Sequence, residues 1–128
     1  MIDRLIELCI WREARGASEQ ARIGVYSVII NRFVLQFEGA TSIAEVILKP
    51  FQFSSFNWTD PGHAHFPRQI NESDWKAWLD IQALVKTTPI DNTQGATHYF
   101  DSSIAPPSWA DPTKKTVEIP PFSFYKLA

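Results

Sequence analysis

The sequence lacks the features that would place it in a membrane, on a nucleic acid or in a disulfide-stabilised class. It has one cysteine, Cys9, so no disulfide can form within the chain. Its 12 basic and 14 acidic residues give a net charge of -2 without any lysine- or arginine-rich cluster, which excludes a nucleic-acid track and binding to an anionic membrane surface. No long uncharged apolar run occurs, so neither a signal peptide nor a membrane span is predicted.

Apolar and aromatic residues are abundant instead. They make up 45% and 13% of the 128 residues, which is enough for a core without disulfides or a structural metal. Residues 1–128 are therefore predicted to form one domain. Cys9 lies among apolar residues and is expected to be a small, buried core residue.

Four segments have the apolar periodicity of helices. The first helix is predicted to end at Gly16, and the second to begin at Ser18 or Ala17. The third is predicted to run from Ser42 to a stop at Pro50, and the fourth from Asn71 or Ser73 to a stop at Pro89. Trp75 and Trp78 on the fourth helix are predicted to pack in the core. After Pro89, only residues 97–100 are predicted as a strand, and the rest, including an aromatic tail, as wrapping loops. The predicted fold class is mainly α (α+β), with a small strand-and-loop lobe.

Glu13 is the most informative residue because it continues an apolar stripe of the first helix. At about 100° per residue, Ile2, Ile6 and Cys9 lie within about 40° of Glu13 around the helix axis. Partial burial and the negative end of the helix dipole both disfavour a charged carboxylate there. Glu13 is thus expected to hold its proton, as a general acid must. In the alternative interpretation, the helix rotates or ends early, and Glu13 is a solvated residue or a partner of Arg12 or Arg15.

Four short motifs occur in a specific order along the chain. They are Glu13-Ala14-Arg15-Gly16, then Val28-Ile29-Ile30-Asn31-Arg32, then Pro50-Phe51-Gln52-Phe53-Ser54, and finally Gly95-Ala96-Thr97-His98-Tyr99-Phe100. In this order and spacing the chain resembles the spore cortex-lytic, SleB/CwlJ-type family of cell wall hydrolases. The resemblance extends over nearly the whole chain, from about residue 5 to residue 125.

This resemblance implies a lysozyme-like single domain that cleaves peptidoglycan glycan strands between N-acetylmuramic acid and N-acetylglucosamine, without a metal or other cofactor. Glu13 falls on the position of the catalytic acid. The motifs and the aromatic loop after Pro50 supply the residues expected to bind the sugars, which are Gln52, Phe53, Ser54, Trp58, His98 and Tyr99. The chain departs from the family where Ala17 replaces a second acid and His98 replaces a tyrosine.

A second catalytic carboxylate is not evident, although glycosidases normally use two. Asp60 and Asp101 are the candidates, and both also fit ordinary turn positions. A lytic transglycosylase needs one acid, because the 6-hydroxyl of the muramic sugar takes the place of water. We therefore expect a lytic transglycosylase, with hydrolysis left open.

Three other interpretations use different residues. His63, His65 and His98 suggest a zinc amidase or peptidase, but no His-Glu-x-x-His helix motif is present. A cysteine peptidase built on Cys9 is disfavoured by the position of Cys9 within an apolar helix face. A non-catalytic wall-binding or structural module of a phage or secretion apparatus would not need Glu13.

The absence of an export signal bears on where the protein acts. A wall-cleaving enzyme made in the cytoplasm must reach the wall by release from the cell or through another protein. This favours a phage lysin or a virion-borne enzyme, with a delivery protein or a phage structural component as partner.

Overall fold

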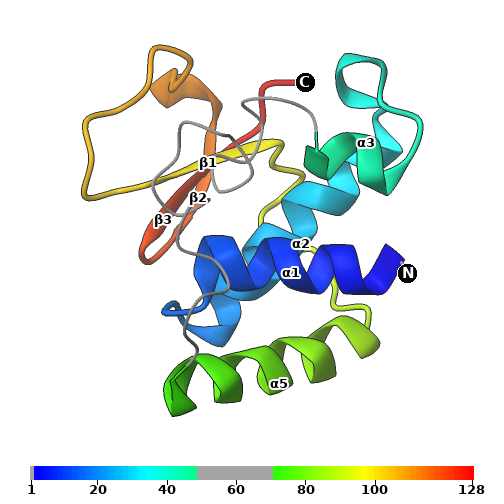
Figure 1. The fold of residues 1–128 in the computed structure, drawn as a ribbon. Helices are drawn as coiled ribbons and strands as arrows, with labels where there is room; N and C mark the ends of the chain where they lie inside the picture. Colours follow the sequence, from blue (N-terminus) through cyan, green and yellow to red (C-terminus); the bar gives the residue numbers. More distant parts are fainter. Residues whose placement is uncertain (1, 49–70) are drawn as a thin grey trace.

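The computed structural model describes residues 2–48 and 71–128, which form helices and one small sheet (Figure 1). In chain order the elements are α1 (Ile2–Ala14), α2 (Glu19–Val34), the 3-10 turn η1 (Phe37–Gly39), α3 (Ile43–Leu48), α5 (Glu72–Lys86), β1 (His98–Asp101), the 3-10 turn η3 (Pro112–Lys114), β2 (Lys115–Ile119) and β3 (Phe122–Tyr125). The mainly helical α+β class predicted from the sequence is confirmed.

The helices begin where local sequence signals predict. Ser18 and Asn71 cap α2 and α5 with their side-chain oxygens, and Asn71 does so within a complete capping box. At α3, the Ser42 hydroxyl accepts a hydrogen bond from the Glu45 N–H at 3.1 Å. The Glu45 carboxylate, however, accepts from the N–H of Thr41 at 2.7 Å, one residue earlier than in a standard capping box.

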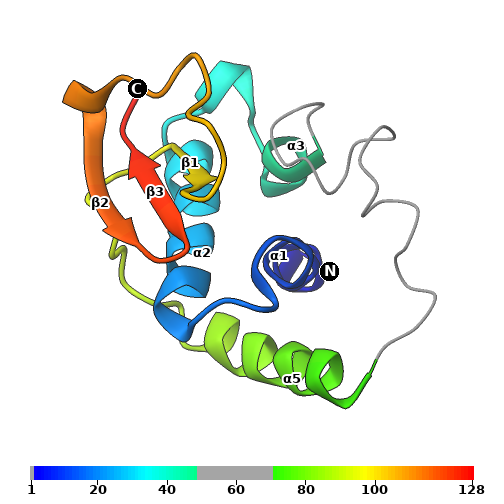
Figure 2. The same ribbon diagram turned by 90° about the vertical axis from the view of Figure 1, so that its left-hand side faces the viewer.

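Helix α1 lies in the middle of the helical part. Figure 2 looks along α1, with α3 above it, α5 below it, and α2 with the sheet on the left. Contacts with α2, α3 and α5 account for its burial. The largest apolar side chains with almost no exposed surface come from both the helices and the sheet: Ile10, Val25, Val28, Ile29, Ile47, Ile81 and Phe124. The core therefore reaches from the helices to the sheet.

The sheet has three antiparallel strands in the order β1-β3-β2. Tyr99 of β1 lies opposite Phe124 of β3, and Val117 of β2 lies on the other side of the same residue. The predicted strand at residues 97–100 is confirmed with a shift of one residue. The prediction of wrapping loops was wrong for β2 and β3, which form the rest of the sheet.

The two tryptophans of α5 differ in their environment. Trp78 is half-buried and contacts Trp11 edge to face, with ring centroids 6.2 Å apart. Trp75 is 55% exposed, so its predicted core position was wrong. The cause is the rotation of α5, which turns Ala77 and Ile81 inward and leaves Trp75 outside their stripe.

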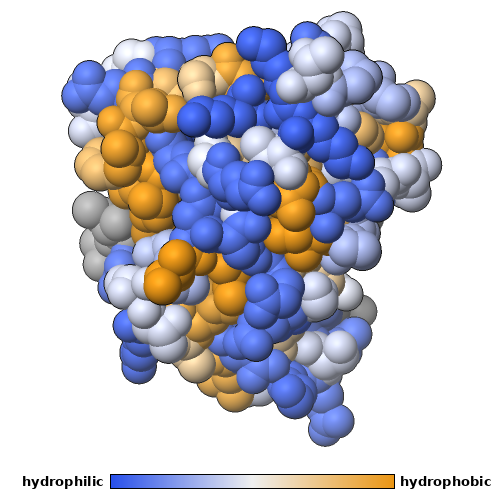
Figure 3. Space-filling view, turned by 180° about the vertical axis from the view of Figure 1, so that it is seen from behind, coloured by the Kyte–Doolittle hydropathy of each residue, from blue (hydrophilic) through white to orange (hydrophobic). Residues whose placement is uncertain are grey.

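The surface on the reverse side carries apolar patches separated by hydrophilic side chains (Figure 3). Within residues 2–48 and 71–128, no helix is both long and apolar enough to cross a membrane.

Candidate functional site

Glu13 lies in the last turn of α1 and is half-buried. Ile6 and Cys9, which precede it on the same stripe, are buried, so the predicted inward-facing stripe is confirmed at these two residues. Arg15, a predicted alternative partner of Glu13, instead forms an ion pair with Asp74 of α5, with its Nε 3.3 Å from Asp74 Oδ1. The helix therefore reaches the end of the stripe and brings a carboxyl group to the edge of the core.

Tyr99 of β1 meets Glu13 at this point. Its hydroxyl donates a hydrogen bond of 2.7 Å to Glu13 Oε1. Burial, and then the nearby Glu13 charge, raise the pKa of Tyr99 well above its ordinary value. Tyr99 is therefore a neutral donor throughout the physiological pH range.

Arg32 of α2 is a buried cation behind this pair. Only 4% of its surface is exposed, and its Nε donates a hydrogen bond of 2.6 Å to the Thr97 carbonyl at the start of β1. Burial lowers the pKa of Arg32, while the neighbouring Tyr99 and Cys9 act in the opposite direction. A guanidinium retains its charge even so. The sequence interpretation gave Arg32 no role, although an arginine near the end of an apolar helix was the available signal.

His98 is on the same strand as Tyr99 but on the other face, as neighbours on a strand are. Its ring lies between those of Phe37 and Trp109, at centroid distances of 5.2 and 5.0 Å. Its Nδ1 is 2.9 Å from the Thr97 hydroxyl. Burial, and secondarily the charge of Arg32, lower the pKa of His98 to about 4. The ring is therefore neutral at neutral pH, when it can bind through hydrogen bonds and ring contacts only.

Of the other predicted site residues, the structure describes only Asp101. Asp101 accepts a hydrogen bond of 2.9 Å from the Ser103 N–H, which fits a turn acid. The remaining predictions lie outside the described residues, namely Gln52, Phe53, Ser54, Trp58, Asp60, His63 and His65. The part of the chain that the structure describes has no group of three or more histidine, cysteine or acidic side chains arranged to hold a metal.

Cys9 has none of the properties of a nucleophile. It has no exposed surface, and burial raises the pKa of its thiol well above the ordinary value, with the Glu13 charge adding to the effect. Thiolate formation is therefore strongly disfavoured. Cys9 is a core residue, as predicted.

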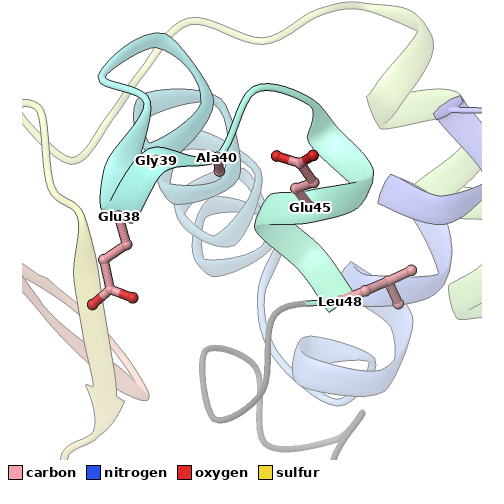
Figure 4. A pocket seen from close by; sticks show the side chains of 5 residues that line it. All are labelled: Glu38, Gly39, Ala40, Glu45 and Leu48. Atoms are coloured by element: carbon pink, nitrogen blue, oxygen red, sulfur yellow. The ribbon is translucent and has the colours of Figure 1, made fainter.

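A cavity of about 370 Å³ lies between η1 and α3 (Figure 4). Glu38 and Glu45 line it together with Gly39, Ala40 and Leu48. The negative charge of Glu38 acts on both His98 and Arg32, so this wall of the cavity adjoins the residues around β1. A second cavity of about 540 Å³ lies between α2 and α5.

Comparison with known proteins gives two matches. The sequence model of the cell wall hydrolase family matches residues 16–125, a range that starts just after Glu13. Among solved structures, the chain is similar to the catalytic domain of the Bacillus cereus SleB protein, with a TM-score of 0.67 and 25% sequence identity. This similarity covers 98% of the present chain and 89% of the other. No curated protein sequence matches the chain. The resemblance predicted from the four motifs is thus confirmed, and the chain belongs to the cell wall hydrolase family.

Proposed function

We propose that this protein cleaves peptidoglycan glycan strands between N-acetylmuramic acid and N-acetylglucosamine, with Glu13 as the general acid and base. The observation that carries the proposal is the place of Glu13, a half-buried carboxyl group at the inner end of α1 where the helices meet the sheet. Family membership and the similarity to the SleB catalytic domain support a wall-cleaving activity.

We favour a lytic transglycosylase over a hydrolase. Glu13 would donate its proton to the bridging oxygen as the bond to the muramic sugar breaks, and the N-acetylglucosamine end would leave with a new hydroxyl group. The 6-hydroxyl of the muramic sugar would then attack its own anomeric carbon and return a proton to the Glu13 carboxylate. The products are an anhydro ring and a regenerated acid, and no water is consumed.

The environment of Asp101 supports a mechanism with a single acid. Asp101, a predicted second carboxylate, is engaged in its own turn with Ser103. Hydrolysis with two carboxyl groups requires them to be about 5 to 9.5 Å apart on either side of the bond. An internal hydroxyl nucleophile removes this requirement.

The principal experiment is a peptidoglycan zymogram with Glu13→Gln. We expect at least a 100-fold loss of clearing, since general acid catalysis contributes about 10² to 10⁴ in rate. Glu19→Gln is the matched control, because Glu19 is exposed at the start of α2 and should be dispensable. Normal clearing by Glu13→Gln would refute the proposal, and loss of clearing in Glu19→Gln alone would move the acid to Glu19.

Mass spectrometry of the digested strands separates the two reactions. A transglycosylase yields anhydro-muramic ends that are lighter by one water than the reducing ends left by a hydrolase. Reducing ends alone would restrict the proposal to a muramidase. A role in phage release or entry, with a delivery partner, remains a prediction from the sequence.

A further inference from the structure

We infer that Tyr99 is a positioning residue for Glu13, which orients its carboxyl group and stabilises the carboxylate that remains after proton transfer. This inference rests on the proposed function of Glu13 and deepens it. The family resemblance placed Tyr99 along the sugar cleft, whereas the structure directs its hydroxyl at a carboxyl oxygen of Glu13, 2.7 Å away.

The hydrogen bond gives Glu13 a fixed partner in both of its protonation states. Tyr99 stays protonated, so its hydroxyl donates to Glu13 Oε1 when the carboxyl group is charged. A phenol hydroxyl can also accept a hydrogen bond, so the same contact orients the carboxyl group when Glu13 is protonated.

Tyr99 is held firmly enough to fix this orientation. Its ring packs against Phe122 and Phe124, with centroids 5.0 and 5.7 Å away. At the start of the strand, Arg32 donates to the Thr97 carbonyl, and the Thr97 N–H donates to the Tyr125 carbonyl at 2.9 Å. The ring of Tyr99 is thus packed against β3, and the start of its strand is hydrogen-bonded to α2 and β3.

The same hydrogen bond gains strength when Glu13 loses its proton. Hydrogen bonds to a charged acceptor are about twice as strong as those between neutral groups. Among the described residues, the charge of Glu13 also acts on Cys9 of its own helix, which stays a neutral thiol, and on Arg32 of α2. Tyr99 makes a direct contact with the carboxyl group and can stabilise the developing carboxylate.

The test is Tyr99→Phe, assayed on soluble uncross-linked glycan strands over a range of pH. We expect kcat to fall about 10- to 100-fold, the kinetic equivalent of losing a hydrogen bond to a charged group, with KM nearly unchanged. We also expect the alkaline limb of the pH profile to move to higher pH, because the carboxylate form has lost a donor. Tyr125→Phe removes a hydroxyl from the adjacent strand β3 and is the matched control, with neither change expected.

Two results would overturn the inference. A raised KM with kcat preserved would return Tyr99 to sugar binding, and a lower kcat without movement of the alkaline limb would reduce it to a structural role. If Tyr99→Phe does not fold, a fluorinated tyrosine at this position keeps the ring and makes the hydroxyl a stronger donor. The limb should then move to lower pH, and an unmoved limb would contradict the inference.

Failure of this inference and failure of the proposed function are distinguishable. An active Glu13→Gln variant removes the proposed function whatever Tyr99 does. An inactive Glu13→Gln variant beside an unaffected Tyr99→Phe variant removes only the positioning role.

Discussion

The contact between Gly24 and Phe124 joins α2 to the sheet and allows a direct test of the packing. A Cβ atom added at Gly24 would lie under 3.0 Å from Phe124 Cζ, and 3.0 and 3.2 Å from Cε1 and Cε2. The Phe124 ring has no exposed surface and is flanked by the rings of Tyr99 and Phe122. It cannot swing aside without displacing Tyr99, which holds the Glu13 carboxyl group.

The expected cost of Gly24→Ala is the difference between two effects. Overpacking a core costs about 1–3 kcal/mol, and contact this close to a buried ring puts the cost near the upper end. Alanine returns about 1 kcal/mol through its higher helix propensity. The net destabilisation is therefore about 1–2 kcal/mol, or a fall in Tm of roughly 3–8 °C for a domain of this size.

Thermal and denaturant unfolding measure this change. Gly16→Ala is the matched control, because an added Cβ there meets nothing within 4 Å, and we expect it to be neutral or stabilising by up to about 1 kcal/mol. Phe124→Leu makes room for the new methyl group, so the double variant should lose less than the sum of the single variants. A Gly24→Ala variant as stable as the wild type would refute the close approach of α2 to β3.

Two further predictions concern pH. Burial alone would raise the pKa of Asp91, but hydrogen bonds from three neighbouring residues outweigh it and hold this pKa below the ordinary value. The Asp91 carboxylate therefore stabilises the fold fully above the ordinary carboxyl pKa, and this stabilisation is lost as the pH falls through the lowered pKa of the folded state. Asp91→Asn should be less stable than the wild type at neutral pH, and the two should converge near about pH 3 in denaturant unfolding. For His98, burial and then Arg32 lower the pKa to about 4. Because the folded-state pKa is the lower one, stability is complete above the unfolded value of about 6.5 and declines below it. An NMR titration of the His98 ring should show its midpoint near the lower value, and a midpoint near the ordinary one would contradict the burial of this side chain.

The helices were predictable because their signals are local. Ser18 and Asn71 cap helices from within three residues of the groups they satisfy, and apolar periodicity needs only neighbouring residues. The strands β2 and β3 were missed because a strand is stabilised by partners elsewhere in the chain. All four residues of β3 are buried, so the alternation that marks a half-exposed strand is absent.

Of the candidate site, the position of Glu13 was predictable from the sequence, but its contacts were not. The position of Glu13 on a buried stripe follows from helix geometry within a single segment. Its contact with Tyr99 spans 86 residues, and the bond from Arg32 to Thr97 spans 65. Nothing in the local sequence encodes such distances, since they depend on how α1 and α2 pack against the sheet.

The end of α1 is held by Arg22 of α2, which bears on its dynamics. The Arg22 guanidinium donates to the carbonyls of Ala14 and Arg15 at 3.2 and 2.6 Å, so two terminal acceptors of α1 bond to a neighbouring helix. Helix ends ordinarily fray at almost no cost in free energy. Here fraying must also break the two hydrogen bonds from Arg22, so the final amides of α1 should exchange with deuterium more slowly than those of a free helix end.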